Sequence, residues 1–454
     1  MFVRYPLLLG SSILLLAAVG CSGEGTTSEG APTYHADIEP LLARHCQSCH
    51  SPGNIGPFSL VNYEQAKALA PAIVAATQSG SMPPFGAKDT DECQPRFGWK
   101  DDLRLSQAEI DRIAAWNAAG APEGDPASAP APFVPPEPGL PGAAMELTPK
   151  TPFVTSGDND QFRCFVMDPA LTGTKFIDGM HIVPGNPAVV HHALTFRAQR
   201  DDILPKVDAD GGFECFGSPS GDLLHAWAPG AVPFVLDPGI GAELGPNHVF
   251  VTQIHYHPAG KVADPDATKL QVRFTEAEPK WAFQIGLIGN SDNASDGLMP
   301  GPNDNGGAEF RIPAGVKDHT ETSFFVVPPL PGTDHAKLYM VGSHMHYVGT
   351  DMHIKVDRKA TFNDDPESEC LVQTPDWSFA WQRTYVYDTP IDALPQAHAG
   401  DVFTLRCTYD NTLENPDLKR ALSEQGLMHP TEVRLGESTL DEMCLFVLGY
   451  LLPR

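Results

Sequence analysis

A proline-rich stretch divides this sequence into two parts of different character. Residues 122–142, PEGDPASAPAPFVPPEPGLPG, contain eight prolines. Proline fixes φ and lacks a backbone N–H, so such a run forms neither a helix nor a central strand and stays extended. We interpret residues 122–142 as a semi-rigid linker between a helical segment and a longer β-rich part.

Before the linker, apolar residues recur with a helical period. The stretch ADIEPLLARHC places Ile38, Leu41 and Leu42 on one face. The stretch SQAEIDRIAAWNAAG, residues 106–120, begins with the Ser–x–x–Glu pattern of a capping box and ends at glycine. These patterns predict a small all-α domain over residues 34–121.

After the linker, short β-prone runs alternate with turn residues. VVHHALTFRA, HVFVTQIHYH, KLYMVGSHMHYV and DVFTLRCTY are separated by glycine, proline and aspartate. Residues 143–454 are too many for one small sandwich. We therefore expect two consecutive all-β sandwich domains, residues 143–295 and 296–454, divided near the turn-rich stretch at 289–307.

The N-terminus has the pattern of an export signal. A positive residue, Arg4, precedes the apolar stretch 7–20, which is too short for a convincing membrane span. It ends in AVGC, which resembles a bacterial lipobox and implies a signal peptide over 1–20, lipidation of Cys21 and a flexible tether over 21–33. The protein would then be exported and anchored to the bacterial membrane, facing periplasm or cell surface. The alternative is an ordinary secretory signal in which Cys21 is incidental.

Charge and cysteine content narrow the classes further. The chain has 57 acidic and 30 basic residues, for a net charge of −27, so nucleic acid is excluded as an expected partner. Export permits disulfide bonds. Six cysteines lie outside the lipobox and outside the C-x-x-C motif of residues 46–49: Cys93, Cys164, Cys215, Cys370, Cys407 and Cys444. Their spacing alone does not decide how they pair.

The stretch CQSCH, residues 46–50, is a C-x-x-C-H motif. Cys46 and Cys49 can form thioethers with haem vinyl groups, and His50 can then ligate the iron. The competing interpretation is a redox or metal-binding C-x-x-C. Export, the adjacent histidine and the helical surroundings favour one covalently attached haem c.

Residues 34–120 also resemble a small cytochrome c domain. The loop SGSMPPFGA looks like the distal-methionine loop of that family, which implies Met82 as the second axial ligand. His35 and His45 are the other candidates, and the alternative for Met82 is a packed loop residue.

Three histidine clusters lie in the β-prone runs. They are His191 with His192, His255 with His257, and His344 with His346. In a strand, residues two apart share a face, so GSHMHYVGT aims His344 and His346 at one point, whereas a vicinal pair needs a bulge or twist to do so. Imidazole suits several metals, whereas a thioether selects Cu(I). Met443, in the terminal apolar run, could supply that thioether or pack in the core.

The same part of the chain resembles the copper type II, ascorbate-dependent monooxygenases, a group that contains peptidylglycine α-hydroxylating and dopamine β-monooxygenases. VVHHALTF, QIHYH, GSHMHYVG and DEMC look like four motifs of that family, in the family order. The resemblance implies two copper ions. One would be bound by His191, His192 and His255, and the dioxygen-binding copper by His344, His346 and Met443. The two sites would face each other across a solvent-filled cleft, and His257 would lie outside the ligand set.

The resemblance also has structural and functional implications. It implies a disulfide between Cys407 and Cys444. Apart from the resemblance, we suggest a second disulfide between Cys164 and Cys215. Gly342, Leu445 and Val447 stand where the peptide-hydroxylating members carry arginine, asparagine and tyrosine. Peptidylglycine is therefore a poor candidate substrate, and a less polar one is favoured.

The expected function is hydroxylation of a C–H bond of an unknown small-molecule or peptide substrate with O2. Electrons would come from an ascorbate-like reductant or a redox protein, through the fused haem. The alternative is a non-catalytic surface lipoprotein that transfers electrons or binds metal. The expected fold is thus multidomain, with a small all-α cytochrome c-like domain followed by two all-β, jelly-roll-like sandwiches.

Overall fold

The computed structural model describes residues 30–454 except 53–55, 130–138, 158–159, 216, 218, 229–230, 258–263, 305 and 363. The predicted signal peptide, the lipidation site Cys21 and most of the tether lie outside the described residues. None of the helices in the described part of the chain is long and apolar enough to cross a membrane.

Helices before the linker form a small cluster of their own. A π-helical turn η1 (Tyr34–Ile38) leads into α1 (Glu39–His45), followed by α2 (Tyr63–Gln78) and α3 (Gln107–Ala118). The capping box at the start of α3 is present, with Ser106 and Glu109 each bonded to the other's backbone. Apolar side chains on the inner faces make a core, which includes Tyr34, Ile38, Leu42, Ala66, Ile113 and Trp116.

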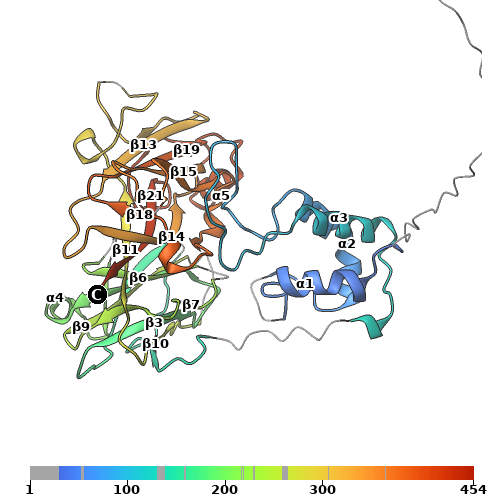
Figure 1. The fold of residues 1–454 in the computed structure, drawn as a ribbon, viewed down its shortest axis with the longest axis horizontal. Coiled ribbons are helices and arrows are strands. Elements are labelled where there is room, and N and C mark those ends of the chain that lie inside the picture. Colours follow the sequence, from blue (N-terminus) through green and yellow to red (C-terminus); the bar gives the residue numbers. More distant parts are fainter. Residues whose placement is uncertain are drawn as a thin grey trace, which may run out of the picture.

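This helical segment is not a distinct all-α domain. The chain between α2 and α3 leaves the helices, runs onto the β-rich part and returns, as Figure 1 shows. There Phe85, Ala87 and Trp99 are buried in the core of the β-rich part, and Cys93 is disulfide-bonded to Cys370. The prediction of a separate cytochrome c-like domain is therefore wrong. Helical periodicity correctly located helices but carried no information about the excursion, whose contacts lie far away in the sequence.

Four sheets make up the β-rich part. A five-stranded sheet has the spatial order β5 (Gly212–Glu214), β2 (Gln161–Met167), β9 (His248–Tyr256), β4 (Val190–Gln199) and β6 (Asp222–Trp227). A four-stranded sheet has the order β13 (His319–Val326), β19 (Val402–Tyr409), β15 (Gly349–Asp357) and β16 (Ser368–Thr374). A small sheet pairs β12 (Arg311–Ile312) with β20 (Val433–Arg434).

The largest sheet has ten strands. Its order is β1 (Met145–Leu147), β10 (Lys269–Phe274), β3 (Lys175–Val183), β8 (Ile240–Leu244), β11 (Trp281–Gly289), β21 (Leu445–Pro453), β14 (His335–His344) and β17 (Thr384–Val386). In addition, β7 (Phe234–Val235) pairs with β3, and β18 (Gln396–His398) pairs with β14. Short helices connect the strands: α4 (Arg200–Ile203), α5 (Pro416–Glu424) and the 3₁₀ turns η2 (Pro126–Ser128), η3 (Leu204–Lys206), η4 (Ala294–Asp296), η5 (Phe379–Trp381) and η6 (Ile391–Ala393).

The ten-stranded sheet joins the two halves of the β-rich part. Strand β21 at the end of the chain pairs antiparallel with β11 over its full length, from Trp281↔Pro453 to Gly289↔Leu445. One hydrophobic core contains side chains of both halves, among them Phe250 and Phe446. The fold is therefore mostly β and sandwich-like, and the expected series of one all-α domain and two separate sandwiches is wrong. Alternation of polar and apolar residues identifies strands, but it does not say which strands become neighbours.

Three disulfides cross-link the structure. They join Cys93 to Cys370, Cys164 to Cys215 and Cys407 to Cys444. The expectation of a disulfide-bonded β protein is thus confirmed. Cys46 and Cys49 are free thiols.

Candidate metal centres

His191, His192 and His255 form the three-histidine cluster on neighbouring strands of the five-stranded sheet. His192 and His255 stand directly opposite each other on β4 and β9. A β-bulge between Val190 and His192 shifts the register. The bulge is the local distortion that two adjacent histidines need to turn toward one point.

The ring nitrogens of the three-histidine cluster are spaced as ligands of one metal ion. Nδ1 of His192 lies 3.2 Å from Nδ1 of His191 and 3.3 Å from Nδ1 of His255. Metal–nitrogen bonds of about 2.0–2.1 Å at tetrahedral angles place neighbouring nitrogens about 3.3–3.4 Å apart. The donor set fits a metal of the zinc, copper or nickel type.

Burial favours the neutral imidazole of His191 and of His192. Burial, with the nearby charges of His255 and His257, lowers the pKa of His191 to about 4. Burial and the surrounding histidines hold the pKa of His192 well below its ordinary value. Because metals bind the unprotonated imidazole, the cluster presents free lone pairs at neutral pH.

Asp160 orients the third histidine of the cluster. Its Oδ2 lies 3.2 Å from Nε2 of His255 and accepts a hydrogen bond from the Thr439 hydroxyl at 2.5 Å. Its Oδ1 lies 2.6 Å from Nδ1 of His257. Burial alone would raise the pKa of Asp160, but the bonds from His255, His257 and Thr439 outweigh it and hold that pKa far below its usual range. A carboxylate at Nε2 draws the imidazole proton there and leaves Nδ1 of His255 as the ligating atom.

His344 and His346, the H-x-H pair, lie at the end of β14. Their ring centroids are 5.3 Å apart. Nδ1 of His344 donates to Oε1 of Gln382 at 2.6 Å, and Nδ1 of His346 donates to the Asp441 carbonyl at 3.0 Å. With the proton on Nδ1, the lone pair of each ring is on Nε2. Burial lowers the pKa of His346 to about 3 and also lowers that of His344.

Met443 is brought beside the H-x-H pair by strand register. The pairing of β14 with β21 ends at His344 and Leu445, so His346 and Met443 each lie two residues beyond this last pair. The buried carboxylate of Glu442 accepts hydrogen bonds from the backbone N–H groups of both His346 and Met443 through the same oxygen, Oε1. Burial raises the pKa of Glu442 to about 8, although these N–H groups oppose the rise. Met345, between the two histidines, is fully buried in the hydrophobic core.

Phe379 connects the three-histidine cluster with the H-x-H pair. Its ring centroid lies 5.3 Å from that of His191, with which it is stacked, and 5.8 Å from that of His346. The charges of His344 and His346 also contribute to the low pKa of His192. A buried aromatic ring thus lies against one histidine of each group, and the expected solvent-filled cleft stays a prediction.

The C-x-x-C-H motif follows α1 directly. Cys46 and Cys49 are partly exposed, and burial together with Cys49 raises the pKa of Cys46 to about 12. The ring of His50 stacks on Phe58 at 4.5 Å, and its Nδ1 donates to the Phe58 carbonyl at 3.1 Å. This bond leaves the lone pair on Nε2, which is the atom that an axial histidine uses. The free thiols and the oriented imidazole fit a covalently attached haem.

The candidate second axial ligands differ in their surroundings. Met82 follows α2 and is half-buried. His35 bonds Glu39, and Nδ1 of the buried His45 donates to the Leu103 carbonyl at 2.9 Å. The assignment of Met82 as ligand stays a prediction.

Four supporting residues were not identified from the sequence: Asp160, Phe379, Gln382 and Glu442. Glu442 lies in the DEMC stretch, and its position next to Met443 was the signal available. Asp160 and Gln382 lie outside the regular strands, and Phe379 in a single 3₁₀ turn. Nothing in their local sequence marks them, since their roles depend on contacts with distant histidines.

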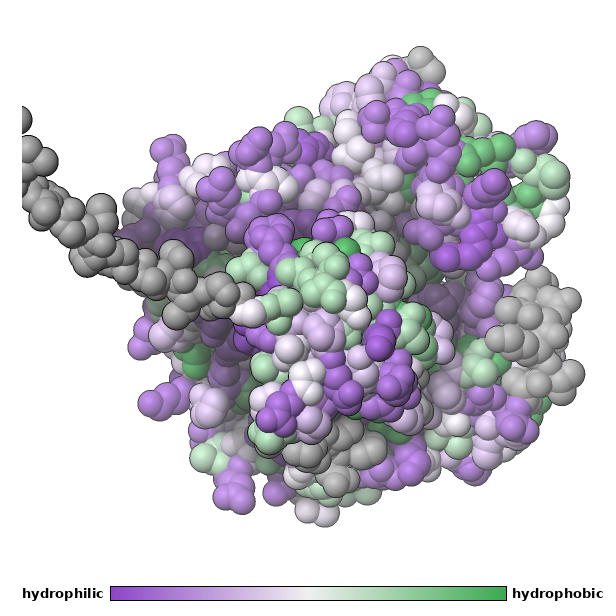
Figure 2. All heavy atoms as spheres, turned by 90° about the vertical axis from the view of Figure 1, so that its right-hand side faces the viewer, coloured by the Kyte–Doolittle hydropathy of each residue, from purple (hydrophilic) through white to green (hydrophobic). Residues whose placement is uncertain are grey.

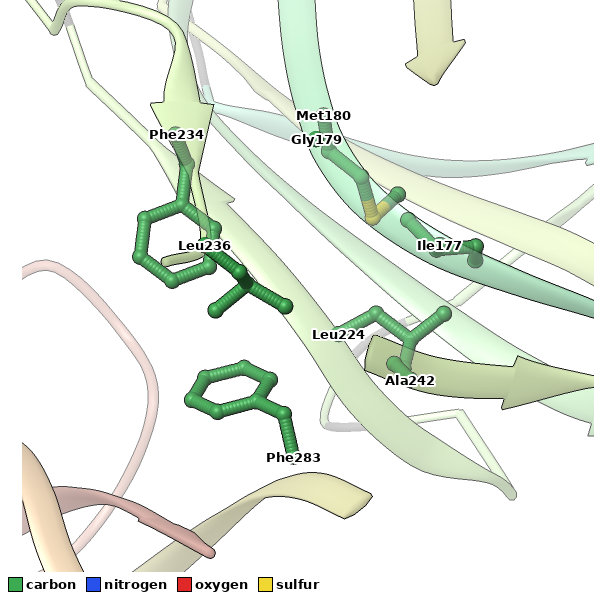
Figure 3. Close-up of a pocket in the computed structure, with 8 residues that line it drawn as sticks. All are labelled: Ile177, Gly179, Met180, Leu224, Phe234, Leu236, Ala242 and Phe283. Atoms are coloured by element: carbon green, nitrogen blue, oxygen red, sulfur yellow. The ribbon is translucent and has the colours of Figure 1, made fainter. Parts of the chain in front are cut away.

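A small apolar pocket lies apart from these groups (Figure 3). The side chains that face it come from β3, β6, β7, β8 and β11 and include Met180, Leu224, Phe234 and Phe283. Its cavity of about 10 Å³ holds one water molecule at most. It is part of the core and offers no room for a substrate. The face that carries the helical segment is largely hydrophilic, with apolar residues in small patches (Figure 2).

Comparisons with known proteins define a class but no activity. No protein-family profile matches the chain. Over 126 residues the sequence is 28% identical to an uncharacterised lipoprotein of Streptomyces coelicolor. The match covers 25% of this chain and 36% of that lipoprotein, so it spans about a third of the relative. The protein is thus a disulfide-bonded, β-rich protein with partial similarity to a lipoprotein.

Solved structures add only distant likenesses. The major capsid protein P2 of bacteriophage PM2 is 11% identical, with a TM-score of 0.25 over 68% of this chain and 97% of that chain. The glycosylasparaginase PNGase F of Flavobacterium meningosepticum is 10% identical, with a TM-score of 0.21 over 59% and 96%. Likenesses at this level support no conclusion about fold or function.

These findings correct the family resemblances. With no matching family profile, an uncharacterised relative and a mostly β fold without a distinct helical domain, the assignment to the copper type II monooxygenases and the cytochromes c is wrong. The chemistry of the histidine groups has to follow from their own geometry.

Proposed function

We propose that this protein is a copper-dependent monooxygenase that hydroxylates a C–H bond of an as yet unknown substrate with O2. The observation that carries the proposal is the position of Phe379, which contacts both His191 and His346. It brings two groups of buried and half-buried imidazoles side by side. The second group has a thioether residue, Met443, two residues before the adjoining strand β21.

Donor chemistry favours copper over zinc. Imidazole suits both metals, but a thioether is a soft ligand that selects Cu(I). Bound copper supplies one-electron redox chemistry and dioxygen activation. The balanced reaction, R–H + O2 + 2 e⁻ + 2 H⁺ → R–OH + H2O, needs two electrons, which matches two one-electron sites in one protein.

The protein's own contribution is to orient the ligands and to limit water. Asp160 leaves Nδ1 of His255 as a ligating atom, whereas Gln382 and the Asp441 carbonyl leave Nε2 of the H-x-H pair. The three-histidine cluster would thus bind a metal through Nδ1 of His255, whereas the H-x-H pair would bind one through Nε2. Phe379 and the surrounding core restrict solvent between them, which strengthens electrostatic interactions at the site.

We also propose that Cys46, Cys49 and His50 hold one haem, whose chemistry is electron transfer. The support is the free thiols, the oriented His50 and the attachment of the helical segment to the β-rich part. Five ion pairs reinforce this attachment beside the Cys93–Cys370 disulfide: Lys88–Asp376, Arg96–Asp365, Arg96–Glu369, Lys100–Asp237 and Arg406–Glu92. Such cross-links would keep a haem at a defined place relative to the histidine groups.

Export and lipid anchoring through Cys21 complete the proposal. The supporting observations are the lipobox-like AVGC, three disulfides and the partial similarity to a lipoprotein. An electron donor, either an ascorbate-like reductant or a redox protein, would then act on the exported side of the membrane.

The experiment measures metal content, EPR spectrum and O2 uptake of the purified full chain with a reductant and a panel of apolar and peptide substrates. We expect two coppers and one haem per chain. Met443→Leu should lose O2 uptake, and the matched control Met345→Leu, a similar change in the core, should retain it. His255→Ala should lose one copper.

Two results would overturn the proposal. Zinc in place of copper would remove the redox chemistry. Copper and haem without O2 uptake on any substrate would leave the non-catalytic, metal-binding and electron-transferring lipoprotein as the function.

A further inference from the structure

A buried carboxylate lies on β13, away from the histidine groups. Glu321 is fully buried. Its Oε1 accepts hydrogen bonds from the Arg311 backbone N–H at 3.1 Å and from Nε2 of His319 at 2.7 Å. Its Oε2 is buried and has no hydrogen-bond partner among the described residues.

The neighbouring histidine is hydrogen-bonded at both of its ring nitrogens. Nδ1 of His319 lies 2.8 Å from the Asn303 side-chain amide, which donates to it. The ring proton is then on Nε2, which faces Glu321.

A second carboxylate oxygen in the same place is also without a partner. Asp304 belongs to the loop that precedes β12, and its Oδ2 accepts from the backbone N–H groups of Gly301 at 2.7 Å and Glu309 at 3.2 Å. Its Oδ1 is buried and unbonded in the described structure. Among the ion pairs of the described residues, neither Asp304 nor Glu321 is paired with lysine or arginine.

Both unbonded oxygens face one small space beside Gly301. A side-chain carbon built on Gly301 would lie 3.3 Å from Oε2 of Glu321 and 3.6 Å from Oδ1 of Asp304. The Thr320 carbonyl oxygen lies 3.5 Å from the same point. Three oxygens of two chain segments thus converge on the side of Gly301 where another residue would carry its side chain.

A buried carboxylate oxygen without a hydrogen bond is costly, and a cation bound by both unbonded oxygens would offset that cost. Carboxylate and carbonyl oxygens are the ligands of hard divalent cations, and calcium takes six to eight of them, with water completing the set. We propose that Glu321, Asp304 and the Thr320 carbonyl bind a calcium-like divalent cation that ties the loop around Gly301 to β13. The alternative is a proton shared between the two carboxyl groups.

The test is ⁴⁵Ca equilibrium dialysis of the purified full chain in the presence of excess magnesium, with melting temperature as a second readout. Glu321→Gln removes a ligand charge, and Gly301→Ala keeps both carboxylates but places a methyl group in the space. Gly301 does not have a positive φ, so alanine fits its backbone. Asp292→Asn, at an exposed position before η4, is the matched control for non-specific binding to an acidic protein.

We expect the wild type and Asp292→Asn to bind one calcium with a dissociation constant of about 0.1–1 mM, as in exported modules, and to melt at higher temperature with calcium. Gly301→Ala and Glu321→Gln should bind at least tenfold more weakly. If Glu321→Gln does not fold, Gly301→Ala alone decides. The proposal would be overturned if the wild type showed no saturable calcium binding, or if Gly301→Ala bound calcium as the wild type does. If the wild type did not bind calcium and Glu321→Gln were stably folded, a proton shared between the two carboxyl groups would be indicated instead.

Discussion

Replacing Asp160 by asparagine should change which nitrogen of His255 carries the proton. The shorter contact of Asp160, 2.6 Å to Nδ1 of His257, keeps the asparagine oxygen on that side. The asparagine NH2 group then faces Nε2 of His255 in place of a carboxylate oxygen, which favours this nitrogen as an acceptor rather than as the protonated atom. The proton of His255 moves to Nδ1, the atom that points at His192 from 3.3 Å.

The size of the effect follows from that switch. A proton on Nδ1 removes the lone pair of one of three ligands, and a positive metal also loses a nearby negative charge. Loss of a carboxylate that orients a ligating histidine typically costs 10–100-fold in metal affinity. That factor corresponds to about 1.4–2.8 kcal/mol.

The assay is competition for Cu(I) with a chromophoric chelator, combined with NMR of the His255 ring to identify its tautomer. Thr439→Val is the matched control, because it removes another partner of Asp160 without changing the partner of His255. We expect a 10–100-fold weaker affinity for one copper in Asp160→Asn and less than a threefold change in Thr439→Val. An Asp160→Asn protein with wild-type affinity, or with the proton still on Nε2, would refute the reasoning.

Three further predictions concern stability. Burial lowers the pKa of His225 to about 3, so the folded state binds fewer protons than the unfolded one, and stability is complete above pH 6.5 and falls as the pH drops. In denaturant titrations between pH 6 and 4, the free energy of unfolding of the wild type should fall by about 1.4 kcal/mol per pH unit relative to that of His225→Phe. Parallel plots of this free energy against pH for the two proteins would contradict the prediction. Replacing Cys93 and Cys370 by alanine opens a loop of 277 residues. The double replacement should lower the free energy of unfolding by about 2–5 kcal/mol and expose the chain between α2 and α3 to limited proteolysis. An unchanged digest would show that the ion pairs alone hold this segment on the β-rich part. Glu442→Ala leaves three buried N–H groups without their acceptor and should destabilise by about 3 kcal/mol or more, with the exposed Glu424→Ala as control in thermal melts.

Strand and helix positions, and the presence of disulfides, followed from the sequence. Strand β19, for example, alternates buried and half-buried residues along its whole length, which is the pattern that its sequence predicts. The proximity of His344 and His346 likewise needs only a spacing of two. Such features are local, because they depend on the periodicity of neighbouring residues.

The tertiary structure alone decided what these local features build. His255 meets His192 through the pairing of β9 with β4, and Glu442 binds the backbone N–H groups of both His346 and Met443. Asp160 and Phe379 complete the site from segments that carry no pattern. The loop containing Phe85 and Trp99 joins a distant core, which made the expected separate helical domain wrong. Register and strand order result from packing summed over the whole chain, so no single stretch of sequence contains them.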